Sequence, residues 1–106
     1  MDGYTRDVVF GSMEDPEATS ARVSTTLGIE MLARDSLHMG GGYHLGHLKD
    51  GSEVRVRPNV DLLDDVPEIT GWQGPAFVEM DARSDAGRQA VERLRAAGFH
   101  RIPGDR

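Results

Sequence analysis

Three of the four histidines, His38, His44 and His47, lie close together in the sequence. Imidazole is the commonest metal ligand in proteins, and a hairpin can bring non-adjacent histidines together. The nearest carboxylates, Asp35 and Asp50, would then complete the site. Residues three apart in a strand point to opposite faces, however, so His44 and His47 are not expected to share an ion. With no cysteine and no HExxH motif, we predict no metal site and no cofactor.

Two further groups contain the residue types of hydrolytic enzymes. Asp35, Ser36 and His38 could supply a triad, but neighbours along a strand cannot converge on one atom, and a GxSxG elbow is absent. Glu79 and Asp81 would project from one strand face, as the acid and base of a glycoside hydrolase could. We interpret that pair as a solvated acidic face. The sequence therefore favours a non-catalytic protein without excluding an enzyme.

Three consecutive glycines, residues 40–42, suggest a phosphate-binding loop. Such a loop needs a following helix whose N-terminus points at the anion, whereas the residues from Tyr43 onward have the pattern of a strand. The formal net charge is −6, and no cluster of basic residues is interleaved with aromatics. We therefore predict that the protein binds neither nucleotides of this type nor nucleic acid.

The distribution of charge is the most distinctive feature of the chain. No basic residue occurs between Arg57 and Arg83, and this segment alone accounts for the net charge of −6. Basic and acidic residues balance over the remainder of the chain. An asymmetry of this kind bears on binding partners rather than on the fold. The carboxylates of the segment are Asp61, Asp64, Asp65, Glu68, Glu79 and Asp81.

The only tryptophan, Trp72, lies in the same segment between Gly71 and Gln73. It either anchors the base of the sheet in the core or is partly exposed as a contact hot spot, where tryptophan is over-represented. Carboxylates beside an aromatic anchor suit a partner rich in arginine and lysine, because opposite charges speed association. We expect a small immunity- or inhibitor-like module that binds a basic protein. The predicted partner-binding residues are Asp61, Asp64, Asp65, Glu68 and Trp72.

An alternative from another class stays open. The chain could be a small enzyme or metal-binding protein in which the hairpin histidines complete a site across a homodimer interface. The strand period opposes this geometry within one chain. Metal retained by the purified protein would distinguish the two hypotheses.

Length and composition indicate one soluble domain spanning residues 1–106. Hydrophobic residues make up 38% and charged residues 28% of the chain, as in ordinary globular proteins. No apolar stretch is long enough for a transmembrane helix, and residues 1–7 lack the apolar region of a signal peptide. We therefore expect a cytoplasmic protein without membrane partners. The 11 arginines against one lysine indicate a GC-rich genome and hence a bacterial source.

Capping residues and periodicity predict two helices. Asp15 suits the N-cap and Pro16 the first position of a helix that ends at Gly28. The apolar stripe over residues 84–97 predicts the second. Two-residue alternation and short apolar runs predict the strands. These strands are expected at residues 8–10, 29–34, 43–48, 53–57, 75–80 and 99–102.

Turn residues determine how these strands connect. Asp50-Gly51 predicts a two-residue type I′ hairpin turn, and the glycines at 40–42 predict a break between strands. Residues 59–75 form a long connection, with room for one helical turn over residues 61–65. Loops of this length are uncommon and are often functional.

The predicted order is β-α-β-β-β-β-α-β. The turns between the middle strands are too short for parallel crossovers. We therefore predict a single α+β domain with a mostly antiparallel sheet of five to six strands and both helices on one face. The predicted core consists of Val54, Val56, Val78, Ala90, Val91 and Leu94.

Overall fold

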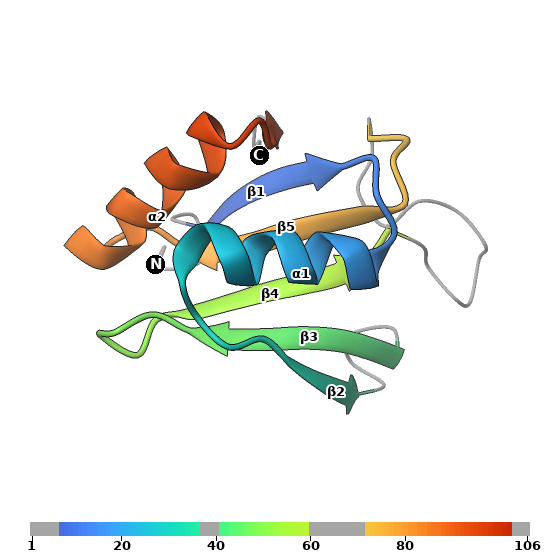
Figure 1. The fold of residues 1–106 in the computed structure, drawn as a ribbon, viewed down its shortest axis with the longest axis horizontal. Helices are drawn as coiled ribbons and strands as arrows, with labels where there is room; N and C mark the ends of the chain where they lie inside the picture. The colour runs from blue at the N-terminus through green and yellow to red at the C-terminus, as the bar shows by residue number, and fades with distance from the viewer. Residues whose placement is uncertain (1–6, 37–40, 60–71, 103–106) are drawn as a thin grey trace.

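The computed structural model describes residues 7–36, 41–59 and 72–102. Over these residues the chain forms one six-stranded sheet in the order β2-β3-β4-β5-β1-β6, with every neighbouring pair antiparallel. Two helices cover one face of the sheet (Figure 1). The predicted α+β fold and element order are confirmed. The elements are β1 (Asp7–Ser12), α1 (Pro16–Leu27), β2 (Leu32–Ser36), β3 (Gly41–His47), β4 (Glu53–Pro58), β5 (Ala76–Asp81), α2 (Asp85–Ala96) and β6 (His100–Ile102).

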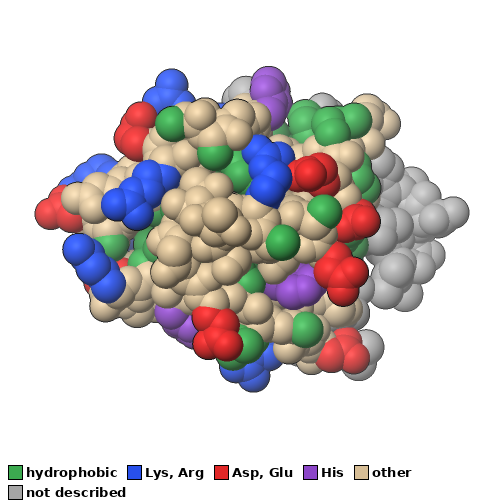
Figure 2. All heavy atoms as spheres, viewed as in Figure 1, with side chains coloured by type: hydrophobic (Ala, Val, Ile, Leu, Met, Phe, Trp, Pro, Cys, Tyr) green, Lys and Arg blue, Asp and Glu red, His purple; other side chains and the backbone are tan. Residues whose placement is uncertain are grey.

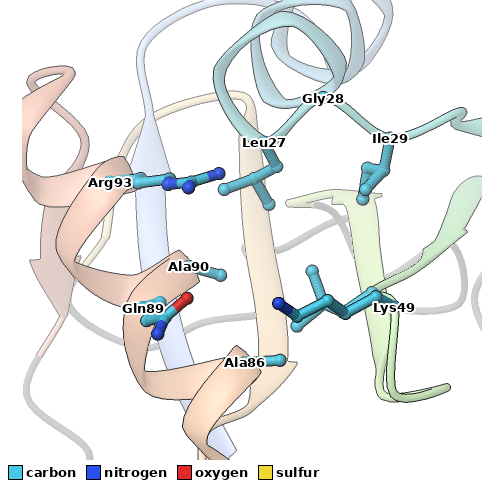
Figure 3. A pocket seen from close by; sticks show the side chains of 9 residues that line it. Leu27, Gly28, Ile29, Lys49, Ala86, Gln89, Ala90 and Arg93 are labelled. Carbon is cyan, nitrogen blue, oxygen red and sulfur yellow. The ribbon is translucent and has the colours of Figure 1, made fainter.

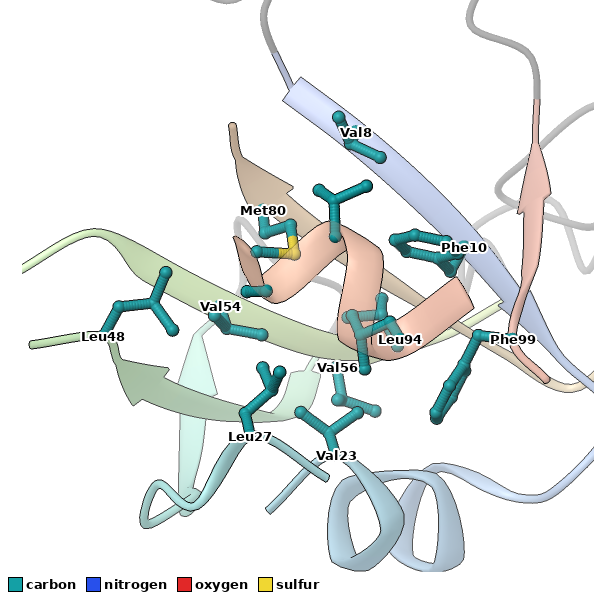
Figure 4. Packing of buried hydrophobic residues seen from close by; sticks show 13 residues of the cluster. Val8, Phe10, Val23, Leu27, Leu48, Val54, Val56, Met80, Leu94 and Phe99 are labelled. Carbon is teal, nitrogen blue, oxygen red and sulfur yellow. The ribbon is translucent and has the colours of Figure 1, made fainter. Parts of the chain in front are cut away.

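The core lies between the helices and the face of the sheet formed by alternate residues of β4, β5 and β1. Val56 pairs with Val78, which in turn pairs with Phe10, so the three side chains form one row beneath the helices. All three are fully buried, and Leu94 of α2 and Val23 of α1 belong to the same buried cluster (Figure 4). The predicted core residues are all buried and belong to this cluster.

Helix α1 begins and ends at its predicted capping residues, and α2 lies within the range predicted for it. The Asp15 carboxylate accepts a hydrogen bond from the Ala18 N–H at 2.7 Å, and Gly28 ends α1 with a φ of 68°. The Ser84 hydroxyl accepts from the Gly87 N–H at 3.0 Å at the start of α2. These bonds satisfy backbone donors that a helix leaves without partners at its N-terminus. Neither described helix is long and apolar enough to cross a membrane.

The strand predicted at residues 29–34 begins later, at Leu32. Ile29 and Met31 instead pack against the edge of the core as the chain passes from α1 to the sheet. The predicted glycine break is wrong for Gly41 and Gly42, which belong to β3 and pair with Ser36 and Asp35. Antiparallel pairing gives their backbones hydrogen-bond partners, which offsets the low strand propensity of glycine.

The hairpin between β3 and β4 is confirmed, but its turn differs from the predicted type I′. The Gly51 N–H donates to the Leu48 carbonyl and the Leu48 N–H donates to the Ser52 carbonyl, both at 2.9 Å. Only one glycine is required in the left-handed region, and Gly51 occupies it with a φ of 90°. This is the three-residue loop that closes with a bulge. Lys49 and Asp50 therefore occupy the tip of the hairpin.

Asp50 connects this tip to the start of α2. Its carboxylate accepts from the Ser52 N–H at 2.9 Å. Hydrogen bonds from Ser84, the N-cap of α2, and from Ser52 lower the pKa of Asp50 from 3.8 to about 2. Because the folded-state pKa is depressed, the ionised carboxylate contributes stability above its unfolded pKa, and this contribution disappears as the pH falls through about 2.

We predict that Asp50→Asn lowers stability at neutral pH and reduces the loss of stability between pH 4 and pH 2. Thermal unfolding of both proteins across this range measures the effect. Carbon NMR of the Asp50 carboxyl should give a pKa near 2 in the folded protein. A midpoint close to 4 would contradict the contact with Ser84.

Leu94 tests the assignment of the core. Its side chain is fully buried between α2 and the sheet, so Leu94→Ala should lower the free energy of unfolding by about 2–5 kcal/mol. Glu92→Ala on the exposed side of the same helix should change it by no more than about 0.5 kcal/mol. Urea denaturation measures both, and similar values for the two variants would contradict the packing.

Candidate functional site

The structure describes the two ends of the predicted acidic site. Asp61, Asp64, Asp65 and Glu68 lie outside the described residues, whereas Trp72 lies within them. Chain direction places the segment between Asn59, after β4, and Trp72, before β5. The geometry of these two ends determines where the segment joins the fold.

Asn59 joins the two ends by hydrogen bonds. Its buried amide donates through Nδ2 to the carbonyls of Trp72 and Gly74, both at 2.9 Å. Its backbone N–H donates to the Pro75 carbonyl at 2.8 Å. We call Asn59 and residues 72–75 the neck. The sequence analysis did not identify Asn59, although an amide directly after a strand ends is a typical partner for loop carbonyls.

Trp72 packs on the face of the sheet that the helices do not cover. Its ring lies against Gly11 so closely that a Cβ at Gly11 would overlap the indole. The Nε1–H donates to the Ala76 carbonyl at 3.1 Å, and the ring stacks on His100 with centroids 5.5 Å apart. The side chain is half-buried and His100 is exposed. Trp72 is therefore an anchor of the sheet and is also partly accessible.

The second sheet face carries an ion-pair network rather than the predicted solvated acids. Strand register places Arg55 opposite Glu79. The Arg55 Nε lies 2.8 Å and the Arg57 Nη1 3.3 Å from the Glu79 carboxylate, whose side chain is only 16% exposed. The solvated-face interpretation is therefore wrong for Glu79. The arginines lie on β4, which neighbours β5 in the sheet but is distant from Glu79 in the sequence.

Asp81 is also neutralised locally. Hydrogen bonds from Arg83 hold the pKa of the Asp81 carboxyl below its ordinary value. Of the carboxylates between Arg57 and Arg83, Glu79 and Asp81 are thus paired with arginine. The other carboxylates of that segment in the sequence are Asp61, Asp64, Asp65 and Glu68.

The hairpin histidines do not share a face. His44 pairs with Val56 on the helix-covered side, whereas His47 pairs with Glu53 on the other, as the strand period predicts. His38 lies outside the described residues. Within residues 7–36, 41–59 and 72–102, no three histidine or carboxylate side chains gather to hold a metal. A site completed across a homodimer interface stays a prediction.

Asp35 and Ser36, the other members of the proposed triad, lie in the edge strand β2. Asp35 is exposed. Its backbone pairs with Gly42 and that of Ser36 with Gly41. The pairing therefore places both residues next to each other along the edge strand β2.

No protein-family model matches this chain, and no curated protein matches it significantly. Functional inference therefore rests on the residues themselves.

The contact between Trp72 and Gly11 gives a test of the neck. Gly11→Ala should displace the indole, lower the free energy of unfolding by about 1–3 kcal/mol and shift the fluorescence of the only tryptophan. Gly42→Ala is the matched control, because its Cβ would meet nothing closer than the Arg34 carbonyl at 3.9 Å. Unchanged fluorescence in Gly11→Ala would contradict the packing of Trp72.

Proposed function

We propose that this protein is a small, cytoplasmic, non-catalytic module that binds a basic protein surface, in the manner of an immunity protein or inhibitor. The observation that supports this most is the attachment of the acidic segment. Four carboxylates without a basic residue lie between two chain ends that Asn59 holds together beside Trp72. The proposed contact residues are Asp61, Asp64, Asp65, Glu68 and Trp72.

Pairing elsewhere on the molecule leaves this segment as the main source of negative charge. In the described part of the chain, six arginines form ion pairs with six carboxylates: Arg22 with Glu14, Arg55 with Glu53 and Glu79, Arg57 with Glu79, Arg83 with Asp81, Arg88 with Asp85 and Arg95 with Glu92. The exposed pairs among them contribute little to stability. They do reduce the field that their members present to an approaching partner.

The start of α1 adds negative charge at the same end of the sheet. Ser12, the last residue of β1, pairs with Ala76, which follows the neck directly. The chain then turns into α1, with Asp15 at its N-cap and Glu17 in its first turn. Acidic side chains gather at this end of the face that Figure 2 shows. A basic partner would therefore meet negative charge from the acidic segment and from the start of α1.

The joined ends and the half-buried indole also lower the cost of binding. Ordering a mobile loop or side chain on association costs free energy, and a group already held in place costs less. Trp72 is fixed by its hydrogen bond to Ala76 and by its stack on His100. We expect the carboxylates to govern the association rate and Trp72 the dissociation rate.

Trp72 fluorescence provides the test, because the protein has one tryptophan. A nine-residue arginine peptide is the probe, and titration should give a saturable change that weakens with added salt. Asp64→Asn combined with Asp65→Asn should leave the fold intact and slow association about threefold or more at low salt. Most of that loss should disappear at high salt because screening removes the steering.

Glu30→Gln combined with Asp35→Asn is the matched control. Both residues are exposed, and the change in net charge is the same. This control should associate at close to the unmodified rate. Equal slowing in both double variants would show that only net charge matters, and an unchanged, salt-independent rate in the Asp64/Asp65 variant would also overturn the proposal.

A further inference from the structure

A cavity of about 250 Å³ lies away from the neck, between the end of α1, the tip of the β3–β4 hairpin and α2. Its floor is apolar and is formed by Leu27, Leu48, Ala86 and Ala90. The two alanines stand one helical turn apart on α2, and their small side chains leave the hollow between the helices. Its volume is slightly below the roughly 300–1,000 Å³ of typical ligand pockets.

Two cationic side chains reach the cavity from different elements. Lys49 comes from the hairpin tip and Arg93 from α2, with Gln89 one turn before Arg93 (Figure 3). The figure shows Arg93 directed from α2 toward Leu27 and Lys49 directed from the hairpin toward α2. The three-residue turn positions Lys49, because it places this residue beyond the last paired position of β3.

Neither cation has an acidic partner among the described residues. Six of the arginines form ion pairs there, but Lys49 and Arg93 do not. Asp50 is adjacent to Lys49 in sequence, yet its carboxylate accepts hydrogen bonds from Ser52 and Ser84 instead. Two positive groups thus flank an apolar hollow, and none of the described residues that line it is a carboxylate.

From this arrangement we infer that the cavity binds a small organic carboxylate with a compact apolar body. The carboxylate would lie between the Lys49 ammonium and the Arg93 guanidinium, with the Gln89 amide as a further donor. Its apolar body would contact Leu27 and the two alanines. Charged donors over an apolar floor are the combination that orients such ligands.

The backbone around the cavity favours a carboxylate over a phosphate. Phosphate sites usually add several backbone N–H donors from a glycine-rich turn or a helix N-terminus. Gly28 is the glycine at this cavity, and its N–H already donates to the Ser24 carbonyl at 2.8 Å. The C-terminus of α1 also faces the cavity, and its negative dipole disfavours a phosphate dianion more than a singly charged carboxylate. The positive charge is therefore concentrated in two side chains, which suits a single anionic group.

The probe is 4-methylpentanoate, titrated into nitrogen-labelled protein and followed by amide NMR. Saturable shifts are expected at the hairpin tip and along the facing side of α2. The neutral amide of the same acid should bind at least tenfold more weakly, since it lacks the charge. Inorganic phosphate should give no saturable shifts at these positions.

Three variants locate the site. Lys49→Gln and Arg93→Gln should each weaken binding about tenfold, which corresponds to about 1.4 kcal/mol. Ala86→Leu should abolish binding by filling the hollow. Arg95→Gln is the matched control, because it removes the same charge from the same helix at a residue that does not line the cavity.

The outcomes separate clearly. Loss of binding in Lys49→Gln and Arg93→Gln, with the Arg95→Gln affinity unchanged, supports the site. No saturable shift in the unmodified protein, equal affinity for acid and amide, or equal weakening in Arg95→Gln would each overturn it. Saturable binding of phosphate in place of the carboxylate would overturn the assigned ligand class.

Discussion

Two-residue alternation in the three central strands is the constraint on which the remaining structure depends. Val54 and Val56 in β4, Val78 and Met80 in β5, and Phe10 in β1 all face the helices, and each is fully buried. A slip of one residue in any of these strands would turn its apolar side chains to the other face. The register of the sheet, the seating of both helices and the positions of both proposed sites therefore follow from one packing requirement.

The same alternation decides what the second face of the sheet can hold. Residues between the core positions point away from the helices, so Arg55, Arg57 and Glu79 meet there as a network. Gly11 occupies one such position, and the absence of a side chain leaves space for the Trp72 ring. Trp72 in turn fixes the neck from which the acidic segment departs. The register that buries the core residues of β1 therefore also positions Trp72 on the opposite face of the sheet.

Local information was enough to predict most of the fold. The caps at Asp15 and Ser84 use hydrogen bonds within a few residues, and the strand period of residues 53–57 is visible in the sequence alone. Features that depend on partners distant in sequence were missed or misread. The solvated interpretation of Glu79 is wrong because its arginine partners lie on another strand. The glycine break is wrong at Gly41 and Gly42 because their stabilising partner is β2, whose pairing is not visible in the local sequence.

Prediction of the candidate sites was limited for the same reason. The sequence identifies Trp72 but does not decide whether it is a core anchor or an exposed contact residue. In the structure it is half-buried, because it contacts Gly11, His100 and Ala76 on three strands. The cavity was not foreseen at all. Lys49, Arg93 and Leu27 come from three separate elements, and nothing in their local sequence indicates that they meet.

The helix α1 relates the two proposed sites physically. It begins beside the neck and ends at the cavity, and its 12 residues span about 18 Å at 1.5 Å per residue. Its positive N-terminal end carries Asp15 and Glu17, and its negative C-terminal end faces Lys49 and Arg93. Each group of charges therefore complements the dipole at its own end, which contributes roughly 0.3–1 kcal/mol per favourable charge. This contribution partly offsets the repulsion between the two cations, which have no acidic partner among the described residues. An acidic binding surface and a cationic cavity are therefore compatible in one small domain, because each lies at the end of α1 whose dipole has the opposite sign.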